Sequence, residues 1–173
     1  MWRFGTICNV LENDRTQPEL APAGAIQNRA GMNSEGWFEY LVRVYPHHTD
    51  YSGVVWHGTY LAWMEEARVE SLRSLGIEYA DWVAQGLELP VVELSLRYHR
   101  SVQMGQSVAV RTRIGASEGV RLLWDYEIRS ADTQELYVTA QVTLVGVDRD
   151  KGKIMRQLPP TVQAALAKLA INP

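Results

Sequence analysis

Four stretches of alternating apolar and polar residues follow Pro90 and limit the fold more than any other feature of the chain. Their apolar residues recur at every second position, which is the spacing of a β-strand with one buried face. Short polar turns separate the stretches, and consecutive strands joined by such turns pair as an antiparallel meander. The sequence therefore predicts four strands that pair in chain order, near residues 92–98, 108–114, 122–128 and 136–147.

One long helical pattern, over residues 59–75, precedes these strands. Its apolar residues, among them Leu61, form a broad stripe, and Gly76 stands where helices commonly end. Glu65 lies close to that stripe, and a carboxylate that faces a core is costly unless it is paired or used. A meander with one apolar face needs a cover, and this helix is the only predicted element large enough to supply it.

One further strand precedes the helix and completes the sheet. Residues 38–44 alternate between apolar and polar, and Pro46 ends the pattern because it lacks a backbone donor. The predicted order is therefore one strand, one long helix and four strands. This order defines an α+β fold in which an antiparallel five-stranded sheet wraps around a central helix. Shorter helices are expected near residues 79–85 and 159–170.

Length, charge and cysteine content limit the class of protein. A chain of 173 residues is long enough for one domain with a core. The net charge of -3 provides no basic surface for nucleic acid. No apolar run approaches the length of a bilayer span, so we expect no integral membrane segment. Cys8 is the only cysteine and cannot form an internal disulfide, which favours a cytoplasmic location.

The first 35 residues differ from the rest of the chain. They are rich in turn-forming residues and keep neither a helical nor a strand period. We expect a disordered N-terminal extension over residues 1–35 and one folded domain over residues 36–173. A start codon assigned too far upstream and a short N-terminal helix are the alternatives.

The segment between the first strand and the long helix carries the candidate chemistry. Asp50 and His57 lie there among apolar and aromatic residues, directly ahead of the helix. Free N–H groups and the helix dipole favour negative charge at that end, and a developing oxyanion gains most from donors already aimed at it. The alternative is that Asp50 only forms a turn or a helix cap. Thr59 is better placed to cap the helix, which makes this alternative less favoured.

This order of elements and these motifs resemble the hotdog fold, and more narrowly the acyl-CoA thioesterases of the 4-hydroxybenzoyl-CoA thioesterase type. The central match is the sequence Asp-x-x-Gly-Val-Val-x-His, which runs from Asp50 to His57 directly before the long helix. The resemblance extends over about residues 37–165. Further matching residues are Val42, Arg43, Val44, Tyr45, Thr49, Tyr60, Glu65, Ala67, Arg68 and Glu70.

The resemblance implies hydrolysis of acyl-CoA thioesters to a free acid and CoA. It places Asp50 beside the thioester carbonyl as nucleophile or general base, and the backbone N–H of His57 near the oxyanion. The side chain of His57 is equally open to a structural and a substrate-orienting role. Glu65 either pairs with Arg68 or positions a water molecule, and pairing is favoured. The residues expected to bind substrate are Gly53, Val54, Val55, Trp56, Tyr60 and Arg97. The candidates for the phosphates of coenzyme A are Arg97, His99, Arg100 and Arg111, with solvated positions on exposed strand faces as the alternative.

Three histidines near the motif raise the alternative of a metal site. The spacing of His47, His48 and His57 matches no zinc pattern, and the cysteine is remote from them in sequence. We therefore expect no metal and no other cofactor. His47 and His48 are expected at exposed loop positions.

The resemblance also implies an assembly. Members of the family form dimers with sites at the interface, and often tetramers, so we expect a homodimer or homotetramer in which each site uses both chains. The expected substrate is an acyl-CoA, with an acyl carrier protein thioester as the alternative. A different class of function remains open, in which a non-catalytic hotdog module binds acyl thioesters or serves assembly. A hydratase of the same fold is a weaker alternative.

Overall fold

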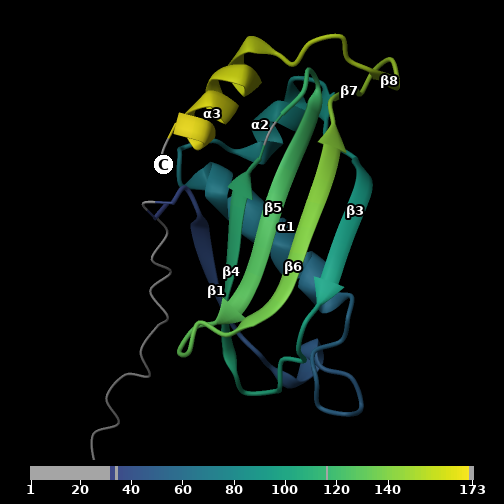
Figure 1. Cartoon of the computed structure of the whole chain (residues 1–173). Helices are drawn as coiled ribbons and strands as arrows, with labels where there is room; N and C mark the ends of the chain where they lie inside the picture. The colour runs from purple at the N-terminus through teal and green to yellow at the C-terminus, as the bar shows by residue number, and fades with distance from the viewer. Residues whose placement is uncertain (1–31, 34, 116, 172–173) are drawn as a thin grey trace, which may run out of the picture.

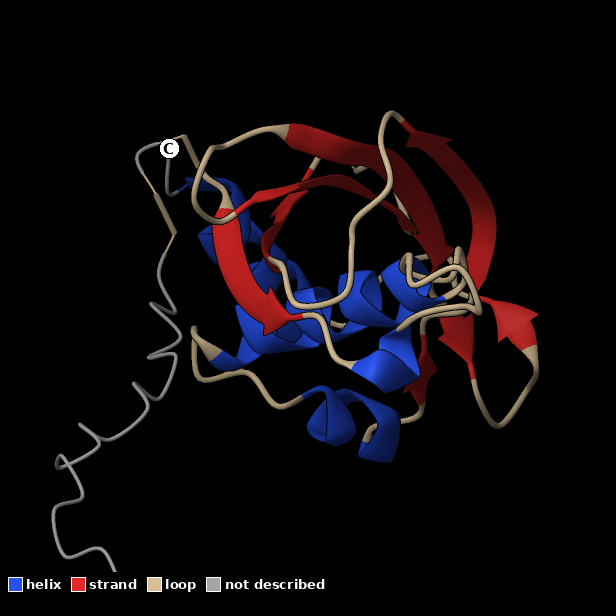
Figure 2. Cartoon of the chain, turned by 90° about the horizontal axis from the view of Figure 1, so that it is seen from below, coloured by secondary structure: helices blue, strands red, loops and turns tan. Residues whose placement is uncertain are grey.

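The computed structural model describes residues 32–33, 35–115 and 117–171 (Figure 1). A five-stranded antiparallel sheet curves around the long helix α1 (Thr59–Arg73), and the view from below shows the strands arching over the helices (Figure 2). The predicted α+β architecture is thus confirmed. In the order of the sheet, the strands are β1 (Phe38–Arg43), β4 (Ser107–Ile114), β5 (Arg121–Ser130), β6 (Leu136–Val145) and β3 (Val91–Tyr98).

The position of β3 differs from the prediction. The meander is confirmed for β4, β5 and β6, but β3 pairs with β6 at the far edge of the sheet and not with β4. Residues 99–106 therefore do not form a tight hairpin turn. Val102 instead accepts the backbone N–H of Val55, at 2.9 Å, and Gln103 forms a bridge with Val54. The connection between β3 and β4 is thus paired with the loop that precedes α1.

Helix α1 buries one face against the sheet. Trp63, Met64 and Ala67 are almost fully buried there, but Leu61 is 39% exposed, so its predicted place in the apolar stripe is wrong. The helix begins after Gly58, which is its N-cap residue and has no side-chain cap. The predicted cap at Thr59 is therefore also wrong. Gly76 adopts a φ of +74°, in the left-handed conformation that commonly ends helices, as predicted.

A second, smaller layer closes one end of the molecule. The last strand, predicted to extend to about residue 147, stops at Val145. Gly146 follows it, and Leu158 packs where a side chain on Gly146 would lie. The chain then continues into a separate three-stranded sheet. The elements of this end are α2 (Tyr79–Ala84), β2 (Leu87–Glu88), β7 (Val147–Asp148), β8 (Lys153–Ile154) and α3 (Pro160–Ile171).

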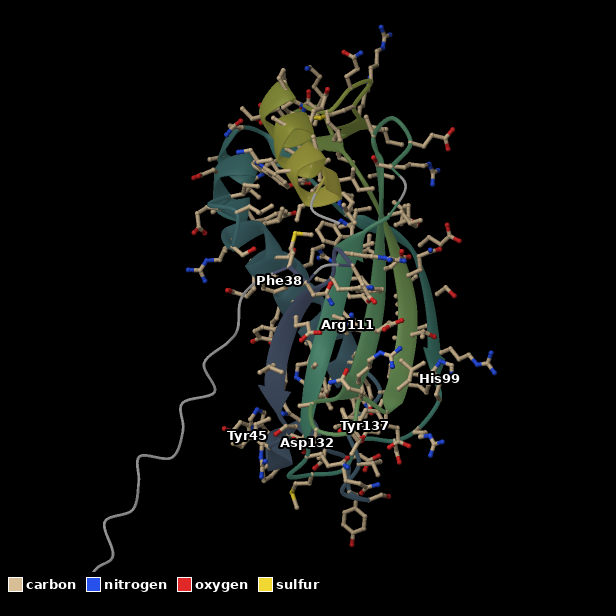
Figure 3. The ribbon with its side chains drawn as sticks, turned by 60° about the vertical axis from the view of Figure 1, so that its left-hand side comes forward. Phe38, Tyr45, His99, Arg111, Asp132 and Tyr137 are labelled. Carbon is tan, nitrogen blue, oxygen red and sulfur yellow. The ribbon has the colours of Figure 1, made fainter. Side chains whose placement is uncertain are left out.

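The outer face of the sheet carries a network of ion pairs. Arg111 lies near the middle of this face (Figure 3) and is only 12% exposed at its side chain. Its guanidinium lies within 3.4 Å of carboxylate oxygens of Glu35, Glu39 and Glu127, and over the ring of Trp37. Arg111 therefore stabilises the sheet rather than offering a free cation to a phosphate.

The N-terminal prediction lies almost wholly outside the described residues and stays a prediction. Of residues 1–35, only Met32, Asn33 and Glu35 are described; Met32 forms a bridge with Phe38, and the side chain of Asn33 accepts the backbone N–H of Glu35. Within the described part of the chain, no helix has the length and apolar character needed to cross a membrane.

Candidate functional site

Asp50 lies in a tight turn between the 3-10 helix η1 (Pro46–His48) and α1. Its backbone N–H donates to the carbonyl of Val54 at 2.9 Å, and its own carbonyl accepts the N–H of Gly53 at 3.1 Å. Gly53 adopts a φ of +75°, which suits glycine because it has no Cβ. Asp50 Oδ1 accepts the backbone N–H of Ser52 at 2.8 Å. Asp50 therefore does stabilise the turn, but it uses only Oδ1 to do so. Its other carboxylate oxygen, Oδ2, accepts no hydrogen bond from the described residues.

The start of α1 presents two backbone donors near this turn. The carbonyl of Trp56 accepts the N–H of Thr59 at 2.9 Å, and the carbonyl of Gly58 accepts that of Leu61 at 3.1 Å. In the part of the chain that the structure describes, neither the N–H of His57 nor that of Gly58 has a protein acceptor. Both N–H groups lie at the positive end of the helix dipole, where they can stabilise a negative charge.

Contacts on two sides hold the loop before α1 in place. The carbonyl of His48 accepts the N–H of Trp56 at 3.0 Å and the hydroxyl of Thr59 at 3.1 Å. On the other side, the N–H of Val55 donates to Val102, as described above. The turn of Asp50 and the start of α1 are thus fixed relative to each other by η1 and by the connection between β3 and β4.

A cleft of about 390 Å³ opens beside these groups. It lies where β3 ends next to the start of α1, and it is lined by Asp50, Val55, His57, Tyr60, Tyr98, His99, Arg100 and Ser101. A second cavity of about 420 Å³ lies under α3, near the opposite end of the sheet in Figure 1. No predicted site residue lines that second cavity, so the cleft at Asp50 is the candidate site.

The structure brings most of the predicted site residues together. Asp50, Val55, His57 and Tyr60 line the cleft, while Gly53 and Val54 form the turn beside it. Trp56 is half-exposed, and its ring centroid lies 4.6 Å from that of His57. The indole also occupies the space in which a side chain on Gly58 would lie.

Glu65 and Arg97 lie away from both the cleft and the turn beside it. Glu65 has a side chain that is 72% exposed and lies 3.6 Å from Arg68, which agrees with the pairing that we favoured. Arg97 lines a different groove, on the outer face of the sheet, with Arg113, Asp125 and Gln141. Arg68 itself turns inward and donates to the hydroxyl of Tyr126 at 3.2 Å.

Four other residues also line the cleft, namely Tyr98, His99, Arg100 and Ser101. The sequence singled out only His99 and Arg100 among them, as candidates for the phosphates of coenzyme A. His99 marks this edge of the sheet in Figure 3. Tyr98 donates its hydroxyl to the carbonyl of His57 at 2.9 Å, and Arg100 lies 2.8 Å from Glu135. The pairing of β3 with β6 brings these residues to α1, and the alternating pattern of β3 contains no signal for that pairing.

The two cleft tyrosines are suited to act as neutral groups. Burial raises the pKa of the Tyr60 phenol and that of the Tyr98 phenol. Both hydroxyls therefore keep their protons at neutral pH. The Tyr60 hydroxyl accepts the backbone N–H of Val102 at 3.3 Å, and the two rings pack edge to face at 5.5 Å.

His47 and His48 belong to a separate aromatic cluster. His48 packs against Trp63 at 5.2 Å between ring centroids, and its Nδ1 accepts the backbone N–H of Tyr45 at 3.1 Å. The predicted exposed position is correct for His47 and wrong for His48, which is half-buried. Among the described residues, no group of three or more His, Cys, Asp or Glu side chains is arranged to hold a metal ion.

Solved structures of similar architecture define the class of fold. The chain superposes on Slr0204 of Synechocystis, a 1,4-dihydroxy-2-naphthoyl-CoA thioesterase, with a TM-score of 0.71, 28% identity, and 78% of this chain and 98% of that one covered. The DHNA-CoA thioesterase of Staphylococcus aureus gives a TM-score of 0.71 and 29% identity, with 78% and 91% covered. The predicted hotdog fold is confirmed.

The sequence comparisons give the family. The profile of the thioesterase-like superfamily matches residues 44–166, a range that contains the whole cleft. The chain is 49% identical over 163 residues to "Putative esterase sll0410" of Synechocystis sp., with 91% of this chain and 98% of that protein covered. It is 32% identical over 127 residues to the acyl-CoA thioester hydrolase YbgC of Escherichia coli, with 73% and 93% covered. The chain belongs to the thioesterase-like superfamily and is by class a thioester hydrolase.

Proposed function

We propose that this protein hydrolyses acyl-CoA thioesters to a free acid and CoA. The observation that carries the proposal is that Asp50 and His57 line one cleft at the start of α1, and that the N–H of His57 has no acceptor among the described residues. The N–H of Gly58, directly after His57, has none either. The names of its relatives, which include acyl-CoA thioester hydrolase, agree with this substrate class.

The proposed chemistry begins with the thioester carbonyl oxygen at the N–H groups of His57 and Gly58. These donors stabilise the negative charge that forms on the oxygen as the carbonyl carbon is attacked. In the nucleophilic route, Asp50 attacks that carbon, the C–S bond breaks, and the CoA thiolate leaves and takes up a proton. Water then cleaves the anhydride, which releases the acid and restores the carboxylate of Asp50. In the general-base route, Asp50 accepts a proton from the attacking water, and that proton passes to the departing thiolate.

The free oxygen of Asp50 supports either route. Oδ1 is held by the N–H of Ser52, so the side chain has a fixed direction, while Oδ2 has no partner among the described residues. A residue that only formed the turn would have no reason to line a cleft, and a module that only bound acyl thioesters would have no use for a carboxylate beside the thioester carbonyl. The place of Asp50 in the cleft and its carboxylate therefore favour hydrolysis over the non-catalytic alternative.

We further propose that the protein acts as a homodimer joined along β3. This edge strand exposes Val91, Val92 and Leu94 to solvent, and exposed apolar sheet edges are normally paired or covered. Tyr98, at the end of the same strand, lines the cleft. A second chain at this edge would therefore lie next to the site, which is consistent with active sites that use both chains.

Hydrolysis of a panel of acyl-CoAs, measured by the release of free thiol, tests the proposal. We expect Asp50→Asn to lower kcat by about 100-fold or more, as loss of a general base or nucleophile does. Asp150→Asn is the matched control, because Asp150 is exposed in the turn between β7 and β8, far from the cleft. Turnover of Asp50→Asn within a few-fold of wild type would refute the role of Asp50. Binding without hydrolysis of any substrate would instead favour the non-catalytic module.

A further inference from the structure

We propose that Tyr98 is a positioning residue that orients the backbone of His57 for oxyanion binding, an inference that rests on the proposed thioester hydrolysis. The Tyr98 hydroxyl donates to the carbonyl oxygen of His57 at 2.9 Å. This contact joins the end of β3 to the first residues before α1, two parts of the chain that are 41 residues apart.

The contact acts on the peptide group that carries a proposed oxyanion donor. The carbonyl of His57 and the N–H of Gly58 belong to the same peptide group, so a hydrogen bond to one fixes the direction of the other. A carbonyl that accepts a hydrogen bond also makes the N–H of its peptide a stronger donor, since hydrogen bonds in a chain polarise one another. Tyr98 therefore both aims and strengthens the Gly58 donor.

The peptide on the other side of His57 is held by different means. The carbonyl of Trp56 accepts the N–H of Thr59, at 2.9 Å, in the turn that leads into α1. The His57 carbonyl has no such partner within the helix among the contacts of the described residues. Its orientation consequently depends on a side chain from β3, and Tyr98 supplies that side chain.

Tyr98 is itself well supported. Its backbone pairs with Val138 on β6, and its ring packs edge to face against Tyr60 at 5.5 Å. Tyr60 is almost fully buried and is anchored by the N–H of Val102. A tyrosine phenol with its ordinary pKa of about 10 is protonated at neutral pH, and partial burial raises the pKa of Tyr98 further, so the hydroxyl is available as a donor. The hydroxyl is thus positioned by the pairing of β3 with β6 and by a buried residue of α1.

The substitution Tyr98→Phe removes the hydroxyl and keeps the ring. We expect kcat to fall by about 3-fold to 10-fold, the range that corresponds to one net hydrogen bond, with KM changed less than about 2-fold. Tyr79→Phe is the matched control, since it also removes one tyrosine hydroxyl, from a half-buried residue on α2 that does not line the cleft. Both variants should lose a similar, small amount of melting temperature.

Two inhibitors separate positioning from a general structural role. An analogue of acyl-CoA in which a fluorinated ketone replaces the thioester forms a tetrahedral adduct whose oxygen resembles the oxyanion, whereas the alkyl thioether of CoA has no such oxygen. We expect Tyr98→Phe to weaken binding of the fluorinated ketone by about 3-fold to 10-fold, in line with kcat, and to leave binding of the thioether unchanged.

Any different result contradicts the inference. Equal effects on both inhibitors, an unchanged kcat, or a melting temperature far below that of Tyr79→Phe would each show that the hydroxyl does not act on the oxyanion donor. In those cases a wild type that hydrolyses acyl-CoA leaves the proposed function intact. A wild type without hydrolysis on any substrate would overturn the proposed function and this inference together.

Discussion

At the scale of single residues, Asp50 combines two tasks that use different atoms. One oxygen closes the turn to Ser52 and the other is free to react. Asparagine keeps an oxygen that can accept the N–H of Ser52, but it has no negative charge and cannot accept a proton. For this reason Asp50→Asn tests the chemistry of the carboxylate while it preserves the turn.

Gly58 gives a second test at the same scale. Its φ of −74° suits any residue, yet a Cβ there would overlap the ring of Trp56. Because Trp56 is half-exposed, its ring can swing away, so we expect Gly58→Ala to fold with a melting temperature within a few degrees of wild type. The displaced indole lies beside His57, and we therefore expect kcat/KM to fall by roughly 5-fold or more.

A double variant identifies the cause. If the ring of Trp56 carries the effect of Gly58→Ala, that effect should disappear in a Trp56→Leu background, since neighbouring residues are not additive. An equal loss of kcat/KM in both backgrounds would show that the alanine acts on the backbone of the helix start instead.

At the scale of elements, the alternating and helical patterns predicted which elements exist but not how they pair. The patterns of β1, β4, β5 and β6 were informative because each strand buries one face. The pattern of β3 specifies its faces but not its neighbour, and residues 99–106 pair with the loop before α1 instead of closing a hairpin.

The same distinction applies to the candidate site. Asp50 and His57 could be predicted because one continuous motif contains both, and the start of a helix follows it directly. Tyr98 could not, because it reaches the cleft only through the pairing of β3 with β6. Arg97 illustrates the converse: neighbouring residues of a strand point to opposite faces, so it lies in a groove on the outer face.

The short helix η1 makes the stability of the site depend on pH. The ring of His48 accepts the N–H of Tyr45, which requires a neutral imidazole. The backbone carbonyl of His48 accepts the N–H of Trp56 and the hydroxyl of Thr59. Burial chiefly, and the neighbouring His47, lower the pKa of His48, while Glu66 opposes them. His48 therefore becomes protonated at a higher pH in the unfolded chain than in the folded chain.

We expect the melting temperature to fall as the pH decreases from about 7.5 to about 5.5, because protonation of the unfolded state begins near the ordinary histidine pKa of about 6.5. The contribution of neutral His48 to the free energy of unfolding is fully present above that pH. It decreases as the pH falls, until His48 is protonated in the folded chain as well. Thermal melts of His48→Gln over the same range should show a smaller slope. A slope equal to that of wild type would exclude His48 as the origin.

At the scale of the whole molecule, the exposed edge of β3 predicts association. Leu94 is 43% exposed near the middle of this strand. We expect sedimentation equilibrium to show a dimer for wild type and a shift to monomer for Leu94→Lys, because a charge on an edge strand opposes pairing. Ile154→Lys is the control, since Ile154 is an exposed apolar residue on β8, outside the five-stranded sheet. A monomeric wild type, or an equal effect of both variants, would contradict the proposed interface.

Strand β3 also holds Tyr98, so one element serves both the proposed interface and the proposed oxyanion donor. If two chains pair along β3, the open side of the strand that carries Tyr98 is covered, and the strand further stabilised, only in the associated state. Activity per chain would then obey mass action: it would decline on dilution below the dissociation constant of the dimer and return on concentration. The amount of protein in the cell would thereby set not only how many sites exist but how well each one works.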